Sequence, residues 1–351
     1  MLWFLIAAAA VWGLGRLMKA PHSARWTMIG ILYLGVVLAV ALLPAGNPLR
    51  VALGASLAEW LMVGVFAALI WGYVAVLRRL KARASRNAPR RPERLFSDTE
   101  LERYARHIVL RELGGPGQKR LKEAKVLVVG AGGLGSPALL YLAAAGVGTI
   151  GVIDDDRVEN SNLQRQVIHD DEAIGTPKVF SAEAAMKAQN PAVVVRPYHR
   201  RLTEEIAAEL IDEYDLVLDG TDNFVTRYLV NRVCAAQGKP LIAAALSQWE
   251  GQISTYDPAR GAPCYRCIFP EPPAPGLAPS CAEAGVLGPL PGVVGAMMAV
   301  EAVKVITGAG ESLRGRMMIY DALYGENRTM ALRPRPDCPV CGSGSATGSG
   351  A

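Results

Sequence analysis

Four of the six cysteines stand in two C-x-x-C pairs, a spacing that is typical of a metal site. The first pair is Cys264 and Cys267, and the second is Cys338 and Cys341. Two such pairs supply four thiolates, the donor set of a closed, structural, tetrahedral zinc site. A redox C-x-x-C usually stands alone at the start of a helix, so the doubled motif favours zinc.

A glycine-rich loop follows an apolar run, a combination that is typical of nucleotide binding. Lys125–Val129 has the pattern of a buried strand and leads into a G-x-G-x-x-G segment. A helix is predicted from Ser136 to Ala145, and a second strand over Thr149–Ile153 ends at an acid. In this setting glycines let the backbone approach a phosphate, and the acid accepts hydrogen bonds from ribose hydroxyls; the alternative is a tight turn without a ligand. The predicted nucleotide-binding residues here are Gly130, Gly132, Gly133, Gly135 and Asp154.

Basic residues downstream favour a triphosphate over NAD. Arg165 lies in the segment Asn162–Gln166, with amide side chains on both sides. Thr176 and Pro177 are predicted to be the N-cap and the first residue of a helix, which places Lys178 in its first turn. A cation there opposes the helix dipole and indicates an anionic ligand, although a solvated lysine is the alternative.

A third predicted strand, Asp215–Leu218, is followed by another acid, Asp222. Ligands of open parallel sheets bind beyond the carboxyl ends of the strands, so this carboxylate is well placed to hold Mg²⁺ on a triphosphate. The structural alternative is that Asp222 caps a helix predicted over Asn223–Ala236, a role that Asp219 or Asn223 would also fill.

The two remaining cysteines differ in their setting. Cys281 lies in Pro270–Gly288, which is rich in Pro, Ala and Gly and is predicted to be a crossover loop. A thiol on a functional loop is a candidate nucleophile, but none of the four histidines has the motif context of its base, so catalytic use stays one of two interpretations. Cys234 falls among apolar helical residues and is predicted to be a core residue.

The elements that position these residues alternate in type. A capping box at Ser97–Glu100 predicts a helix ahead of the first strand. The order strand, helix, strand, with candidate ligands after the strands, predicts an α/β fold: a doubly wound Rossmann-like sheet that carries one tetra-cysteine zinc site. Its later part, Pro240–Leu332, is expected to add strands and an apolar helix over Val293–Ile306.

The front of the chain has another composition. Apolar runs at Met1–Gly15, Thr27–Leu43 and Trp60–Leu77 approach the roughly 20 residues that a helix needs to cross a bilayer. Basic residues gather after the first and third runs, which by the positive-inside rule places the N-terminus outside and the larger part in the cytoplasm. Residues 1–78 are therefore predicted to hold two to three transmembrane helices in the inner membrane. The first run lacks the basic start of a cleaved signal peptide, the competing interpretation.

The remaining boundaries follow from composition. We predict a basic linker over 79–96, an enzyme domain over 97–341, and a disordered tail over 342–351. The net charge of +5 arises from basic residues that flank the apolar runs. Because a nucleic-acid binder carries its positive charge on the folded domain, we expect no nucleic-acid partner.

Taken together, these motifs resemble the MoeB/ThiF/HesA family, relatives of the ubiquitin-activating enzymes, and most of all its molybdopterin-synthase adenylyltransferases. The likeness covers about Ser97 to Cys341 and leaves out the apolar front. It rests on Arg103–Arg106, Gly130–Gly135, Asn162–Arg165, Pro177–Lys178 and Thr221–Asn223.

The resemblance implies a reaction and its partners. The reaction is ATP-dependent adenylylation of the C-terminal glycine carboxylate of a ubiquitin-like sulfur carrier ending in Gly-Gly, with release of pyrophosphate, as in molybdenum cofactor or thiamine biosynthesis. A sulfurtransferase or a cysteine desulfurase would donate the sulfur, and Pro240–Leu332 would include the carrier-binding face. Cys281 resembles the cysteine that some relatives use for acyl or persulfide transfer.

The resemblance also implies a role for each site residue. The glycine loop, Asp154 and Asn162 hold the nucleotide, Arg165 and Lys178 hold its phosphates, and Asp222 serves Mg²⁺. Arg106 reaches the site from the partner subunit of a homodimer. The four paired cysteines bind zinc.

Two other functions remain open from the residues alone. An NAD-dependent oxidoreductase would use the glycine loop and Asp154, but it leaves Arg165, Lys178 and Asp222 without a role. A noncatalytic, membrane-bound zinc module that docks a partner leaves the same residues unexplained.

Overall fold

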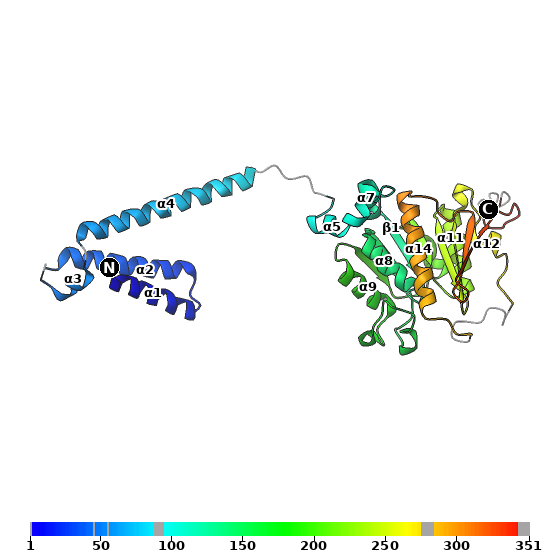
Figure 1. Cartoon of the computed structure of the whole chain (residues 1–351), viewed down its shortest axis with the longest axis horizontal. Helices are drawn as coiled ribbons and strands as arrows, with labels where there is room; N and C mark the ends of the chain where they lie inside the picture. The colour runs from blue at the N-terminus through cyan, green and yellow to red at the C-terminus, as the bar shows by residue number, and fades with distance from the viewer. Residues whose placement is uncertain (1, 45, 55, 88–94, 275–283, 343–351) are drawn as a thin grey trace. The chain divides into compact units, whose positions relative to one another are not determined.

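A computed structural model describes residues 2–44, 46–54, 56–87, 95–274 and 284–342 (Figure 1). The chain divides into two compact units, Met1–Arg94 and Leu95–Ala351. Cys281 and the predicted tail from residue 343 onward lie outside the described residues.

The second unit is built on one eight-stranded sheet with the order β3-β2-β1-β4-β5-β6-β7-β8. The five strands from β3 to β5 run parallel, and β6, β7 and β8 extend the sheet in antiparallel fashion. The strand order reverses between β1 and β4, where an open α/β sheet binds its ligands. The strands are β1 (Lys125–Val129), β2 (Thr149–Ile153), β3 (Val194–Tyr198), β4 (Leu216–Asp219), β5 (Leu241–Leu246), β6 (Glu250–Tyr256), β7 (Arg316–Asp321) and β8 (Glu326–Ala331).

Helices cover both faces of this sheet (Figure 1). One face packs against α7 (Gly114–Glu123), α8 (Gly135–Ala145), α9 (Lys178–Gln189) and α14 (Pro289–Thr307). The other packs against α10 (Glu204–Asp212) and α11 (Phe224–Gln237). The shorter helices are α5 (Asp98–Arg103), α6 (Ala105–Ile108), α12 (Tyr265–Ile268), η1 (Asn160–Asn162), η2 (Asp171–Ala173) and η3 (Pro258–Arg260).

The apolar run of β1 explains this sandwich. Val126 and Val128 point into the core shared with α8 and α9, whereas Leu127 and Val129 point into the core shared with α10 and α11. A strand that is buried on both faces needs apolar residues at successive positions, which is why its sequence shows no polar alternation. The predicted α/β Rossmann-like fold is confirmed.

Several predicted boundaries move. Helix α8 starts at Gly135 and not at Ser136, and α11 spans Phe224–Gln237 and not Asn223–Ala236. Strand β4 starts at Leu216 and not at Asp215; ahead of the strand, the Asp215 carboxylate accepts a hydrogen bond from the N–H of Lys125 (2.8 Å). Helix α9 starts at Lys178, so the prediction of Thr176 as its N-cap was wrong. A bridge between Arg157 and Pro177 keeps the chain extended at that point, and Lys178 still lies in the first turn.

The predicted apolar helix over Val293–Ile306 is α14. Its length and hydropathy would allow it to cross a membrane, but half of it is buried within the protein. It packs against α8, β5 and β6, and Val294 and Met298 are fully buried there. The apolar character of α14 therefore reflects its place in the core.

The first unit consists of α1 (Leu2–Leu17), α2 (His22–Leu42), α3 (Pro48–Leu53) and α4 (Leu57–Asn87). Its small core contains Val36, Val40 and Trp60. The Tyr33 hydroxyl donates to the carbonyl oxygen of Trp60 (2.5 Å), and the ring of Phe4 meets that of Trp60 edge-on. These contacts join α1, α2 and α4.

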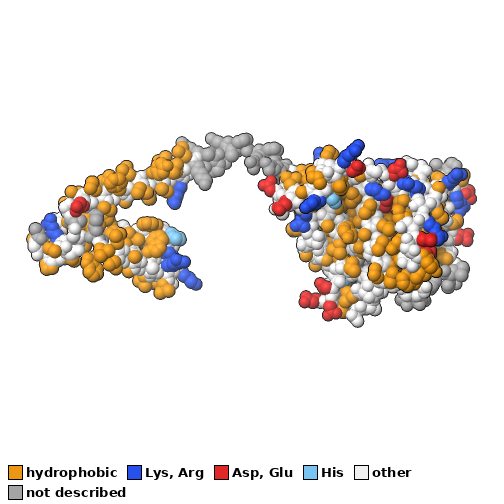
Figure 2. Space-filling model, viewed as in Figure 1, with side chains coloured by type: hydrophobic (Ala, Val, Ile, Leu, Met, Phe, Trp, Pro, Cys, Tyr) orange, Lys and Arg blue, Asp and Glu red, His pale blue; other side chains and the backbone are white. Residues whose placement is uncertain are grey.

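Most other large side chains of these helices are exposed, and Figure 2 shows apolar side chains along their surface. Leu17 is 82% exposed and Trp71 is 76% exposed. By length and composition, α2 and the Leu57–Leu80 part of α4 are able to cross a membrane, whereas α1 is shorter. Helix α4 continues to Asn87, past the predicted start of the linker at residue 79. The crossing itself stays a prediction.

Candidate functional site

The glycine loop lies at the carboxyl end of β1. Gly130 has φ +93° and donates its N–H to the carbonyl oxygen of Ile153 (2.9 Å). A Cβ on Gly135 would lie 1.9 Å from the Gly130 oxygen, so a side chain there is excluded. Within the described residues, the N–H groups of Gly132 and Gly133 make no hydrogen bond. They are available to an anion at the start of α8.

Asp154, at the end of β2, joins this loop to the next. Its Oδ2 accepts a hydrogen bond from the N–H of Ala131 (2.8 Å), and its Oδ1 accepts one from the N–H of Asp156 (2.8 Å). Each oxygen keeps lone pairs for a ligand, because a carboxylate oxygen can accept more than one hydrogen bond. The side chain is only half-buried, so a ligand can reach it. Asp154 thus fixes the glycine loop and borders it at the same time.

The loop that carries Asp222 touches the glycine loop. The position of a Cβ on Gly130 is 3.4 Å from the carbonyl group of Gly220. Asn223 caps α11, since its Oδ1 accepts the N–H of Thr226 (2.9 Å). The interpretation of Asp222 as the helix cap was therefore wrong. Its carboxylate is exposed and has no hydrogen bond or ion pair to any part of the chain that the structure describes.

A buried pair under this loop was not predicted from the sequence. The Asp219 carboxylate is 1% exposed and accepts hydrogen bonds from the N–H (2.9 Å) and hydroxyl (2.6 Å) of Thr221. Arg227 donates to the carbonyl oxygens of Thr221 and Ala244. Two side chains thus hold the residue immediately before Asp222. An acid at the end of a fully buried strand was the available signal for Asp219.

The two predicted basic residues also adjoin the glycine loop. Arg165 lies beside Gly133, and Lys178 is joined to the loop through Asp156 and Asp154. The Cγ atom of Arg165 is 3.8 Å from the position of a Cβ on Gly133. The carbonyl oxygen of Asn162 accepts the N–H of Arg165 (3.0 Å), which closes the turn that presents the guanidinium. Lys178 is only 6% exposed, and its Nζ lies 2.7 Å from Oδ2 of Asp156. That acid compensates the charge of the buried lysine.

Three further buried polar residues surround the loop, and none was predicted as a site residue. His169 Nε2 lies 3.0 Å from the carbonyl oxygen of Ala131, and its Nδ1 lies 2.9 Å from the Ser181 hydroxyl. Gln166 Oε1 and the Ser136 hydroxyl are buried without a hydrogen-bond partner in the described part of the chain. Unpaired buried polar atoms beside a phosphate-type loop fit a polar ligand such as a nucleotide.

Arg106 lies on α6, away from these loops in sequence. Its side chain is exposed and has no polar partner among the residues described. The prediction that it acts in the site of a second subunit is not tested by a single chain.

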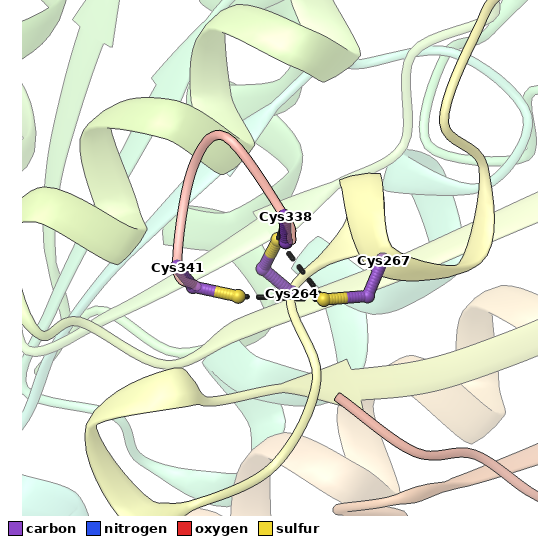
Figure 3. A group of neighbouring side chains, drawn as sticks. All are labelled: Cys264, Cys267, Cys338 and Cys341. Atoms are coloured by element: carbon purple, nitrogen blue, oxygen red, sulfur yellow. Dashed lines mark hydrogen bonds between the residues drawn. The ribbon is translucent and has the colours of Figure 1, made fainter. Parts of the chain in front are cut away.

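The four paired cysteines converge, as predicted (Figure 3). The sulfur of Cys264 is 3.9 Å from that of Cys267 and 3.6 Å from that of Cys338, and Cys267 and Cys341 are 3.3 Å apart. A tetrahedral zinc ion with bonds of about 2.3 Å separates its sulfur ligands by about 3.8 Å. The donor set and the spacing therefore fit zinc.

The surroundings shift the pKa values of these thiols in different directions. Burial raises the pKa of Cys264, and it raises the pKa of Cys341 to about 11. Burial acts in the same direction on Cys338, but hydrogen bonds from the backbone N–H groups of Cys341 and Val340 outweigh it and lower its pKa to about 7. Cys234 is 1% exposed in the core below α11, which confirms its structural role.

A cavity of about 270 Å³ opens on the antiparallel part of the sheet, apart from the glycine loop. It lies where β5 ends and where the β6, β7 and β8 strands meet their connections. Three acids and one arginine line it together with polar and apolar side chains. These include Ser247, Glu250, Gln252, Asp321, Glu326 and Arg328.

The fold and this arrangement agree with a known family. The family model described as "ThiF family" matches residues 104–340. The chain therefore belongs to the ThiF family, and the resemblance predicted from its motifs is confirmed. The match leaves out the first unit.

Comparison with individual proteins shows which members of the family this chain is similar to. It is 52% identical over 251 residues to a sulfur carrier protein adenylyltransferase of Thermus thermophilus, covering 70% of this chain and 93% of that protein. It is 52% identical over 246 residues to a SAMP-activating enzyme E1 of Haloferax volcanii, covering 70% and 90%. It is also 48% identical to the adenylyltransferase and sulfurtransferase MOCS3 of Bos taurus, covering 74% of this chain and 57% of that protein.

Solved structures agree on the fold. The crystal structure of E. coli MccB with MccA-N7isoASN has a TM-score of 0.61 to this chain at 23% identity. It covers 72% of this chain and 77% of MccB. At this identity the likeness supports the fold alone.

Proposed function

We infer that this chain is an ATP-dependent adenylyltransferase that activates the C-terminal carboxylate of a sulfur-carrier protein. The observation that carries this function is the meeting of three loops at the carboxyl edge of the sheet. Among the described residues, the glycine loop offers N–H groups without a partner and Asp222 offers a carboxylate without one, while Arg165 and Lys178 offer cations. The adenylyltransferase names of the relatives agree with the enzyme class predicted from the sequence, which is confirmed.

The residues fit this reaction in named roles. The carrier's terminal carboxylate oxygen attacks the α-phosphorus of ATP, a new P–O bond forms, and the bond to the β-phosphate breaks, releasing pyrophosphate. Arg165 and Lys178 neutralise charge on the phosphates, and Asp222 would hold the Mg²⁺ that accompanies ATP. A carboxylic acid is already ionised at neutral pH, so no general base is required and catalysis is mainly positioning.

The carrier would dock on the antiparallel part of the sheet. The cavity there neighbours the end of β5, and β5 lies next to β4, which leads to Asp222. A globular carrier on this face can extend a flexible Gly-Gly tail toward the nucleotide. We assign the carrier to the class that serves molybdopterin or thiamine synthesis, with a sulfurtransferase or a cysteine desulfurase as the sulfur donor.

Carrier-dependent exchange of radiolabelled pyrophosphate into ATP tests this function. The protein is incubated with purified carriers that end in Gly-Gly and with matched carriers that lack the last two glycines. Exchange should require ATP, Mg²⁺ and the intact tail. Exchange with none of the Gly-Gly carriers, from a folded protein that binds ATP, would contradict the proposal, and binding of NADH in place of ATP would favour an oxidoreductase.

The first unit would anchor the enzyme in the inner membrane. Exposed apolar side chains along α2 and α4 need a nonaqueous surrounding, and their lengths suit a bilayer. The basic residues from Arg78 onward, most of which lie in the last part of α4, would stay in the cytoplasm together with the catalytic unit. Fractionation of cells and protease treatment of sealed vesicles test this orientation: a catalytic unit protected inside right-side-out vesicles supports it, and a soluble full-length protein contradicts it.

A homodimer completes the proposed site. Arg106 is exposed and has no polar partner among the described residues, so a second subunit would place it near the phosphates of its neighbour. Such a cation supplied in trans stabilises developing charge, as arginine fingers do.

A further inference from the structure

His169 connects two phosphate-binding elements that are far apart in the sequence. It lies after the Asn162–Gln166 segment, and it is buried. On one side its Nε2 meets the carbonyl oxygen of Ala131, inside the glycine loop (3.0 Å). On the other side its Nδ1 meets the hydroxyl of Ser181, one turn along α9 from Lys178 (2.9 Å).

We propose that His169 is a positioning residue that fixes the glycine loop relative to Lys178, and thereby the distance between the backbone cradle and the cation that bind the phosphates of ATP. This rests on the proposed adenylyltransferase function. Among the described residues the imidazole forms no hydrogen bond with Lys178 or with the N–H groups of Gly132 and Gly133, so its contribution acts through Ala131 and Ser181. The two hydrogen bonds are the only polar contacts that the imidazole makes within the described residues.

The burial of His169 favours the neutral ring in this role. Burial lowers its pKa, and the nearby charge of Lys178 lowers it further, against the opposing effects of the Ala131 carbonyl, Asp154 and Asp170. A neutral ring has one donor and one acceptor. With the proton on Nε2 it donates to Ala131 and accepts from Ser181, which satisfies both contacts at once.

A displacement of the Ala131 carbonyl would change how the glycine loop binds phosphate. The N–H groups of Gly132 and Gly133 follow directly after Ala131, so movement of the Ala131 carbonyl displaces the predicted phosphate donors. Lys178 is held by Asp156, whose own N–H donates to Asp154, and Asp154 accepts the N–H of Ala131. His169 and Asp154 thus both contact Ala131, His169 at its carbonyl oxygen and Asp154 at its N–H.

Four single variants and one double variant of the full-length protein test this. In His169→Leu the carbonyl oxygen of Ala131 loses the hydrogen bond from Nε2. We therefore expect the KM for ATP to rise about tenfold, while kcat changes by less than about twofold. In His169→Gln the side-chain amide can reproduce the Nε2 donor, so the KM should stay within about threefold of wild type. Ser181→Ala should raise the KM by about threefold, and adding it to His169→Leu should have no further effect, because both act on one bridge. Thr307→Ala, which removes a buried hydroxyl at the distant end of α14, is the matched control.

Direct titration of each variant with ATP–Mg²⁺, without a carrier, supplies a second readout. Weaker ATP binding by His169→Leu that His169→Gln restores is the expected result. If His169→Leu lowers kcat or the folded fraction but leaves the KM and the Kd for ATP unchanged, the residue is merely structural and the proposal is overturned. If His169→Leu does not fold, the Ser181→Ala titration decides: an ATP affinity about threefold weaker supports the proposal, and wild-type affinity overturns it. Absence of exchange in wild type would count against the function, whereas wild-type ATP affinity in every variant would count against His169 alone.

Discussion

The two units of this chain differ in how far they bury their large apolar side chains. In the α/β unit Leu127, Leu139 and Leu142 are fully buried, whereas in the helical unit Leu17 and Trp71 are mostly exposed. Trp60 is the main exception among the helical residues, and it marks their small shared core. The α/β unit therefore buries its large apolar residues in a core, and the helical unit leaves most of the described ones exposed.

The polar residues show a matching contrast. In the α/β unit buried polar groups form defined contacts, such as Asp219 with Thr221, and they gather at the ends of strands. Among the residues of the helical unit whose burial is described, the one buried charge is Arg25, which lies over the ring of Trp12 and donates to the carbonyl oxygen of Ala20 (2.9 Å). From this comparison we predict that the proposed chemistry and the proposed location of this protein are separable, which the following variants test.

The largest effect is expected from Asp222→Ala, which removes the proposed Mg²⁺ ligand. Because the charge on the leaving pyrophosphate would lose its compensation, exchange should fall by about 100-fold or more, while membrane association is unchanged. Asp212→Ala, which removes an exposed carboxylate at the end of α10, serves as the control and should retain exchange. An Asp222→Ala protein that keeps a third of wild-type exchange would remove the assignment.

Loss of one zinc ligand should be the next largest effect, and it should appear in stability. Cys338→Ser leaves three thiolates, and we expect loss of the bound metal with a decrease of several kcal/mol in the free energy of unfolding. Metal analysis of wild type should find one Zn²⁺ per chain. Cys234→Ala is the matched control, because it truncates a core thiol and should keep the metal; equal stability of the two variants would argue against a structural zinc.

The sequence predicted the parts of this site that depend on local pattern. The apolar run of β1, the following glycines and the paired cysteines each carry their meaning within a few residues. Asp222 was predicted for the same reason, since it follows a strand. The register of parallel strands then brings these segments together, as with Val129 of β1 beside Asp219 of β4.

The residues that the sequence did not predict act through contacts between distant segments. His169 meets Ala131, and Arg227 meets Ala244; neither pair shares a local motif. A lone histidine has no period or spacing that distinguishes it from a core residue. The same limit applies to Thr176, because the bridge that displaces it from the helix forms with Arg157, at the far end of the intervening loop.

A moderate effect is expected when two inactive variants are mixed. Arg106→Ala and Asp222→Ala should each be nearly inactive, but in a randomly paired dimer half of the molecules carry one of each. Each mixed dimer has one site with both residues intact, so exchange should recover to about a quarter of wild type. Co-expression with two different affinity tags isolates the mixed dimer. If it is as inactive as either parent, Arg106 does not act in trans.

A smaller effect concerns pH. The pKa of His169 is lowered in the folded protein relative to its ordinary value near 6.5, mainly by burial. The unfolded chain therefore binds a proton more readily, and this contribution to stability is present above that ordinary value and is lost as the pH falls toward the lowered one. Thermal unfolding of wild type and His169→Gln between about pH 5 and pH 8 should show a shallower decline in the variant. Parallel curves would show that His169 does not contribute.

The smallest effect on catalysis is expected from removal of Met1–Arg91, and it tests the comparison as a whole. The deleted residues fall within the first compact unit and outside the family match, which begins at residue 104. The glycine loop and Lys178 make their described contacts inside the second unit, and Asp222 lies in the loop that follows β4 of the same sheet. Exchange per folded molecule should therefore equal that of the detergent-solubilised full-length protein. At the same time the protein should move from the membrane fraction to the soluble fraction, because the exposed apolar helices are gone. A soluble truncated protein that folds and binds ATP, but exchanges pyrophosphate at a tenth of the wild-type rate or less, would show that the helices take part in the reaction and that chemistry and location are not separable.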